Sequence, residues 1–145
     1  MINAFNHTSF AVRDLERAVE FWTKGLGFQA ASVGERNGDW QARVTGVPGA
    51  SLKVAHLFGY GHHMELIQYV SPVAGAFPLQ PNLPGVGHIC LEVTDIDDTV
   101  ARLLSLGGKT QGEVTDVDDG SAKGCRALYI RDPDGIIIEL LELAA

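Results

Sequence analysis

Four residues of the sequence combine chemistry with a repeated placement: His7, Glu65, His88 and Glu139. Imidazole nitrogens and carboxylate oxygens are common ligands of divalent metal ions. Glu65 stands between a methionine and a leucine, and Glu139 follows three isoleucines. A carboxylate in such apolar surroundings is costly unless it is paired or bound to a metal. A lone strand histidine or glutamate is usually ordinary, but a His-then-Glu pair that occurs twice predicts one divalent ion bound by all four residues.

The two pairs belong to an internal repeat. The stretch from His7 to Gly27 resembles the stretch from His88 to Gly108, with matching residues 81 positions apart. Later, Met64-Glu-Leu-Ile matches Ile138-Glu-Leu-Leu, 74 positions apart. The chain is therefore interpreted as two copies of one unit, which decides the expected architecture.

Each copy is expected to follow a βαβββ plan. An aspartate that suits a helix N-cap, Asp14 or Asp95, follows the first strand of each copy, and glycines end the helical pattern that comes next. The predicted strands of the first copy are 5–12, 28–33, 51–58 and 63–69, and those of the second are 88–93, 109–114, 126–130 and 136–141. We expect a first module at 1–70, a linker at 71–85 that holds four of the six prolines, and a second module at 86–145, all within one compact domain.

Strand alternation places the candidate ligands on one face of each predicted sheet. The opposite faces carry apolar residues, which the helices must cover. His56, His62 and His63 are candidate acid–base helpers, and His63 is expected on the face of Glu65. A solvated turn position is favoured for His62 and is an equal alternative for His63, and an ordinary packing role is favoured for Tyr69.

Composition excludes several classes of function. Hydrophobic residues make up 46% of the chain and charged residues 20%, which is ordinary for a globular protein. A net charge of −7 without a Lys/Arg cluster argues against nucleic-acid or anionic-membrane binding. The N-terminal residues lack a signal-peptide pattern, so a cytoplasmic protein is predicted. The two cysteines give no disulfide framework, and Cys90 is expected to be a reduced thiol in the core.

At these residues the chain resembles the vicinal oxygen chelate superfamily, which includes glyoxalase I, methylmalonyl-CoA epimerase, extradiol dioxygenases and bleomycin- and fosfomycin-resistance proteins. The segments that carry the resemblance are His7–Leu15, Met64-Glu65-Leu66, Gly87-His88-Ile89 and Asp132–Leu140. The resemblance implies an α+β fold in which two βαβββ modules form a cupped, mostly antiparallel sheet around a metal site. It also implies that His7, Glu65, His88 and Glu139 occupy the four ligand positions.

The resemblance further implies a metal-dependent glyoxalase-like lyase, isomerase or epimerase that acts on a small oxygenated substrate. In such enzymes Zn, Ni, Co, Mn or Fe stabilises an enolate, and a glutamate moves the proton beside the carbonyl. Glu65 and Glu139 are the candidate bases. Two alternatives remain open, an extradiol-type ring-cleavage dioxygenase and a metal-free drug-binding resistance protein.

Two departures from relatives bear on the substrate. Many glutathione-dependent glyoxalases have an arginine four residues after the first ligand, where this chain has Ala11, and Arg13 is expected on the other face. The linker segment Ser71-Pro-Val-Ala resembles that of methylmalonyl-CoA epimerases, which commonly have glutamine at the position of Glu65. A typical glutathione site is therefore not expected.

Family resemblance and open sheet edges together predict a homodimer. Two arrangements are left open. The two modules of one chain share a site, or a module pairs with its counterpart from the second copy. The irregular stretch Gly34–Gly49 is expected to be a loop beside the site.

Overall fold

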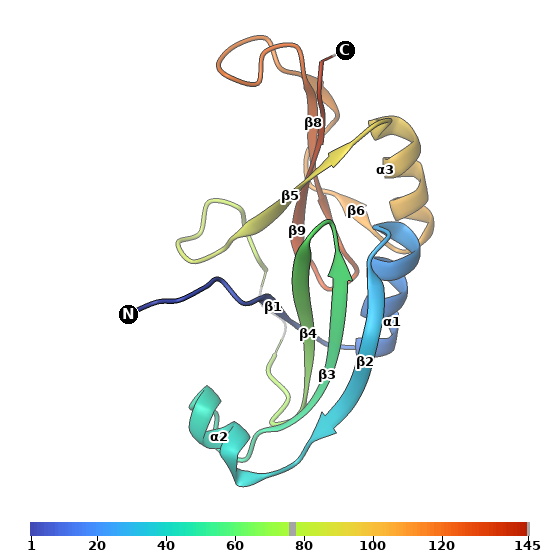
Figure 1. The fold of residues 1–145 in the computed structure, drawn as a ribbon. Coiled ribbons are helices and arrows are strands. Elements are labelled where there is room, and N and C mark those ends of the chain that lie inside the picture. The colour runs from blue at the N-terminus through green and yellow to red at the C-terminus, as the bar shows by residue number, and fades with distance from the viewer. Residues whose placement is uncertain (76–77, 145) are drawn as a thin grey trace. The chain divides into compact units, whose positions relative to one another are not determined.

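The computed structural model describes residues 1–75 and 78–144. The chain divides into two compact units, Met1–Ala76 and Phe77–Ala145, each with a sheet of its own. Figure 1 shows the elements of each unit in chain order from blue to red. No helix of the described residues is long and apolar enough to cross a membrane.

The first unit contains a four-stranded mixed sheet. Its elements are β1 (Thr8–Val12), α1 (Leu15–Glu20), the π-helical turn η1 (Phe21–Gly25), β2 (Gln29–Arg36), α2 (Asp39–Thr45), β3 (Ser51–Gly59) and β4 (His62–Ser71). The strand order is β1-β4-β3-β2. The β1–β4 pair is parallel, and the other two pairs are antiparallel.

The second unit repeats this plan without counterparts of η1 and α2 and with one more strand. Its elements are β5 (His88–Val93), α3 (Ile96–Ser105), β6 (Lys109–Thr110), β7 (Thr115–Asp116), β8 (Arg126–Arg131) and β9 (Ile137–Glu142). The strand order is β5-β9-β8-β6, and β7 also pairs with β8. As in the first unit, the first and last strands are parallel, here β5 and β9.

The predicted α+β class is confirmed, with three local corrections to the expected elements. The expected loop Gly34–Gly49 contains the end of β2 and the helix α2, which Figure 1 shows at the end of the β2–β3 hairpin. The expected strand 109–114 is shortened to β6, because its pairing with β8 ends at Thr110, and the separate strand β7 pairs with β8 only from Thr115. The first strand begins at Thr8 rather than Phe5, so His7 lies just before it.

Equivalent hydrogen bonds attach the helix of each unit to its last strand. The Asp14 side chain caps α1 by accepting from the Arg17 N–H, and Asp95 caps α3 by accepting from the Asp98 N–H. The first backbone N–H of each helix donates to a side chain on the last strand of the same unit. Leu15 N–H donates to Gln68 Oε1 at 2.9 Å, and Ile96 N–H donates to Glu142 Oε2 at 2.6 Å. Two of the four unpaired N–H groups at each helix start are thus satisfied.

α1 in the first unit and α3 in the second each cover one face of their own sheet. In the first unit, Trp22 and Phe21 are fully buried, as are Leu57 and Leu66 on β3 and β4. In the second unit, the buried residues include Leu103 of α3 and Ile138 and Leu140 of β9. Burial of one Leu or Phe side chain contributes roughly 1.5–3 kcal/mol, so these faces dominate the stability of both units.

The N-cap of α3 provides a test of this local structure. We expect Asp95→Ala to lower the free energy of unfolding by about 1 kcal/mol and the Tm by a few degrees. Asp95→Asn keeps a capping oxygen and should cost much less. Asp118→Ala, which removes a charge from an exposed loop, is the control. Thermal unfolding with equal losses in Asp95→Ala and Asp95→Asn would show that charge, not capping, is what Asp95 contributes.

Candidate metal centre

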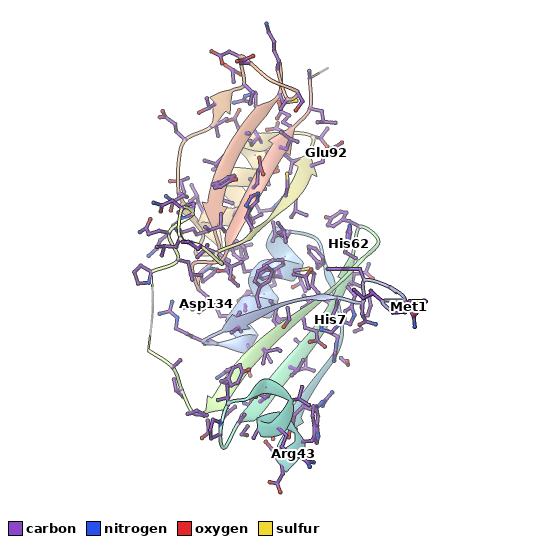
Figure 2. All side chains as sticks on the ribbon, turned by 90° about the vertical axis from the view of Figure 1, so that its left-hand side faces the viewer. Met1, His7, Arg43, His62, Glu92 and Asp134 are labelled. Carbon is purple, nitrogen blue, oxygen red and sulfur yellow. The ribbon has the colours of Figure 1, made fainter. Side chains whose placement is uncertain are left out.

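The first His-Glu pair lies where β1 and β4 run side by side. Parallel pairing sets Ser9 opposite Glu65, and His7 precedes β1 by one residue (Figure 2). His7 Nε2 lies 3.2 Å from Glu65 Oε2. His7 Nδ1 is 2.7 Å from Asn6 Oδ1. A ring that donates from Nδ1 to this amide oxygen presents the Nε2 lone pair on the side of Glu65, as a metal ligand requires.

The second pair repeats this arrangement between β5 and β9. Cys90 stands opposite Glu139 in the parallel ladder, as Ser9 stands opposite Glu65. His88 Nε2 lies 3.0 Å from Glu139 Oε2. The His88 side chain is 38% exposed and that of Glu139 26%, so a solvated ion can reach both.

The spacing of the donor atoms fits metal coordination. Ligand bonds of about 2.1 Å place neighbouring donors roughly 3.0 Å apart at right angles and roughly 3.4 Å apart in a tetrahedron. The separations of 3.2 Å in the first unit and 3.0 Å in the second lie within this range. Each pair therefore suits two adjacent positions on a divalent ion. That both pairs bind the same ion stays a prediction, since each pair lies within its own unit.

Two more histidines adjoin Glu65. His56 on β3 stands opposite Glu65, with its Nδ1 3.3 Å from Glu65 Oε1. The same nitrogen is 3.0 Å from Nε2 of His63, and the His63 ring stacks on Phe58 with 4.5 Å between centroids. His62 is exposed at the start of β4 (Figure 2). The structure thus places two of the candidate helper histidines, His56 and His63, beside the glutamate.

Tyr69 lies elsewhere on the same strand. It packs, half-buried, against an apolar cluster built on Ala50, Leu52 and Val54, with Ala42 of α2 as a further neighbour. This is the ordinary packing role that the sequence favours. Tyr69 and this cluster lie on the same face of the sheet as Glu65 but farther along the strands, where Ala42 of α2 packs against them.

Tyr129 is a site residue that sequence reasoning missed. It stands opposite Glu139 on β8, as His56 stands opposite Glu65 on β3. Its hydroxyl is 3.3 Å from His88 Nε2, and the two rings are 4.8 Å apart. The internal repeat could have revealed it. When the last two strands of each unit are aligned on Glu65 and Glu139, Tyr129 is the counterpart of His56.

The surroundings of Glu139 also affect Cys90, which the structure shows exposed rather than in the core as expected. The error arose because alternate residues of β5 face away from α3, and Cys90 shares the face of His88. Partial burial, followed by the charge of Glu139, raises the pKa of the Cys90 thiol. Partial burial and Glu139 likewise raise the pKa of Tyr129. At neutral pH both groups stay protonated, so they are hydrogen-bond donors rather than anionic ligands.

Comparison with known proteins identifies the fold. A sequence profile of the Glyoxalase/Bleomycin resistance protein/Dioxygenase superfamily matches residues 4–140. The chain belongs to this superfamily. The recognition of the vicinal oxygen chelate superfamily from the ligand-bearing segments is confirmed.

Individual members of the superfamily resemble the chain over nearly its whole length. A 2-epi-5-epi-valiolone epimerase from Actinomyces is 31% identical over 98% of this chain and 80% of its own. An ethylmalonyl-CoA/methylmalonyl-CoA epimerase from Cereibacter sphaeroides is also 31% identical, over 97% of this chain and 98% of its own. A glyoxalase family protein from Bacillus cereus has a crystal structure that superposes with a TM-score of 0.85 at 28% identity, covering 100% and 97% of the two chains.

The contact between Cys90 and Glu139 gives a prediction in metal-free protein. We expect a thiol reagent to modify exposed Cys90 in the folded state and to reach buried Cys125 only after unfolding. Because the charge of Glu139 raises the Cys90 pKa, Glu139→Gln should lower it and speed the reaction at neutral pH. Glu92→Gln, which removes the weaker of the two charge effects, is the control. If the rate of Cys90 alkylation had the same pH dependence in Glu139→Gln as in wild type, the contact between Cys90 and Glu139 would be contradicted.

Proposed function

We propose that this superfamily member is a metal-dependent epimerase or a closely related glyoxalase-like lyase or isomerase. The observation that carries the proposal is the duplicated His-Glu pair, at equivalent positions of the two units and with donor spacings that suit a metal ion. The two 31%-identical relatives named as epimerases support the epimerase reading. Lactoylglutathione lyases are also relatives, one from Escherichia coli at 28% identity over 94% of this chain and 90% of its own.

In this proposal His7, Glu65, His88 and Glu139 hold one divalent ion, with one pair from each unit. Whether the two units belong to one chain or to two copies in a homodimer is left open by the proposal. A mixed histidine and carboxylate set suits Zn, Ni, Co, Mn and Fe(II) alike. When bound, the ion supplies Lewis acidity, which makes a C–H beside a substrate carbonyl more acidic.

The protein's own contribution is proton transfer at that carbon. Glu65 and Glu139 come from different units, so one carboxylate would accept the proton from one face of the carbon while the other, as its carboxylic acid, would donate a proton to the opposite face. Acyl-CoA epimerisation fits this scheme, because inversion beside a carbonyl needs one proton removed and one added. Ala11 at the position of the glutathione-binding arginine favours epimerisation over a glutathione-dependent lyase reaction.

The metal assignment is tested by elemental analysis. Protein purified without added metal should contain about one divalent ion per chain, and His7→Ala and Glu139→Ala should each lose it. Loss of a residue that hydrogen-bonds to a metal ligand typically weakens metal binding 10- to 100-fold. Removal of one of the four ligands themselves should weaken it at least as much. His62→Ala, which changes an exposed histidine near Glu65, should keep the metal. Full occupancy in both ligand variants would rule out the assignment.

The proton-transfer roles are tested by Glu65→Gln and Glu139→Gln. Each keeps an oxygen at the ligand position but removes the basic carboxylate. We expect metal to be retained and turnover to fall by about 10²-fold or more. The substrates to screen are 2-epi-5-epi-valiolone, methylmalonyl-CoA and ethylmalonyl-CoA epimers, 2-oxoaldehyde thiol adducts and catechols.

Solvent deuterium provides the second measurement of proton transfer. Incorporation at the inverted carbon should accompany turnover and decline with it in both variants. Near-wild-type turnover and exchange in both would exclude glutamate-mediated transfer. Oxygen uptake with a catechol would instead favour the dioxygenase alternative.

A further inference from the structure

The β3–β4 hairpin of the first unit carries a second group of metal-binding side chains. The potential ligand atoms of His56, His63 and Glu65 all lie within 4.8 Å of one another. His56 Nδ1 is 3.0 Å from His63 Nε2 and 3.3 Å from Glu65 Oε1. These separations again equal the spacing of neighbouring donors on an ion with bonds of about 2.1 Å. We propose that these three residues bind a second divalent transition-metal ion.

The backbone fixes the positions of all three donors. His56 pairs directly with Glu65 across the antiparallel ladder, and Phe58 pairs with His63. His63 and Glu65 are two residues apart on β4, so they share a face. The Phe58 ring lies on the His63 ring at an angle of 11°, which restricts its orientation. The ladder and this stacked contact thus hold the donors together before any ion binds, which lowers the entropic cost of binding.

The chemistry of the group favours a transition metal. Two imidazoles and one carboxylate are the donor set of non-haem Fe(II) sites and suit Zn and Co equally. Three protein ligands leave further positions for water. The His56 side chain is 24% exposed and that of Glu65 16%, so a hydrated ion has access. The chain's charge of −7 also favours cation binding over anion binding.

The site belongs to the first unit alone. In the second unit the counterpart of His56 is Tyr129, which stands opposite Glu139 as His56 stands opposite Glu65. The counterpart of His63 is Ile137, which occupies the same place two residues before the ligand glutamate and is buried. The repeat therefore supplies the four-residue centre proposed above, and substitutions in one copy supply the three-residue site.

Glu65 belongs to both proposed sites, and a different carboxylate oxygen faces each of them. Its Oε2 faces His7, and its Oε1 faces His56. A carboxylate that offers one oxygen to each of two ions is a familiar bridge in two-metal sites. The inference rests on the proposed function only through this shared residue, because all three donors lie within the first unit.

Cobalt binding tests the second site with the first one disabled. His88→Ala/Glu139→Ala removes both ligands of the second unit and serves as the background. After chelator treatment, this protein is titrated with Co²⁺ and followed by visible absorption and equilibrium dialysis. We expect one ion per chain, with the dissociation constant raised at least about tenfold by His56→Ala, His56→Gln or His63→Ala. His62→Ala and His7→Ala in the same background should change it less than threefold. Wild-type protein, which is expected to hold about one ion as purified, should take up two ions when Co²⁺ is added to saturation.

Two results would overturn the proposal. They are no cobalt binding in the background protein, and binding that His7→Ala removes while the His56 and His63 variants keep it. Circular dichroism shows whether each variant is folded, and His56→Gln retains a polar side chain if His56→Ala does not fold. Failure of the four-residue centre gives a different result, because His88→Ala/Glu139→Ala would then bind as many ions as wild type.

Discussion

Parallel pairing of the first and last strands sets the position of every candidate ligand in both units. The β1–β4 register sets Ser9 opposite Glu65, and the β5–β9 register sets Cys90 opposite Glu139. In each case the histidine comes two residues before the paired Ser or Cys, so it shares that residue's face. A slip of one residue in either pair would turn the glutamate to the helix side of the sheet. The helix-facing core residues of the same strands make such a slip costly.

The same register also links the site to the helix that covers the opposite face. Gln68 and Glu142 come three residues after Glu65 and Glu139, and an odd spacing puts them on the other face of the strand. There they accept hydrogen bonds from the first backbone N–H groups of α1 and α3. One strand therefore carries a candidate metal ligand on one side and a helix attachment on the other. Only two residues separate the ligand from the helix attachment on each of these strands.

The repeat made most of the fold predictable from the sequence. It defined the N-caps Asp14 and Asp95, and the strand His88–Val93 has the bounds that were expected. The helix α2 was missed because it is only seven residues long and has no apolar stripe that extends over several turns. Its end is nevertheless marked by Gly46, whose φ of 70° is a left-handed conformation that glycine adopts without strain.

Strand alternation and the repeat made it possible to predict which candidate residues share a face, but not which residues of neighbouring strands lie opposite one another. Alternation placed His63 beside Glu65 but could not show which residue of β3 lies opposite, because register depends on the hairpin. The turn Tyr60-Gly61 fixes that register and brings His56 next to Glu65. Cys90 was misjudged for a related reason, since an apolar run in the sequence does not reveal which face of a strand the helix covers.

The two glutamates occupy equivalent positions but differ in what surrounds them. Glu65 has a histidine beside each carboxylate oxygen, whereas Glu139 has His88 on one side and lies close to Cys90 and Tyr129, two neutral groups. The two faces of a chiral substrate are themselves unequal, so an epimerase has no need of two identical bases. It needs one carboxylate that takes a proton from one diastereomer and another that returns it to the other face. In the proposed mechanism each βαβββ unit contributes one of these carboxylates, and the different neighbours of Glu65 and Glu139 suit them to different roles.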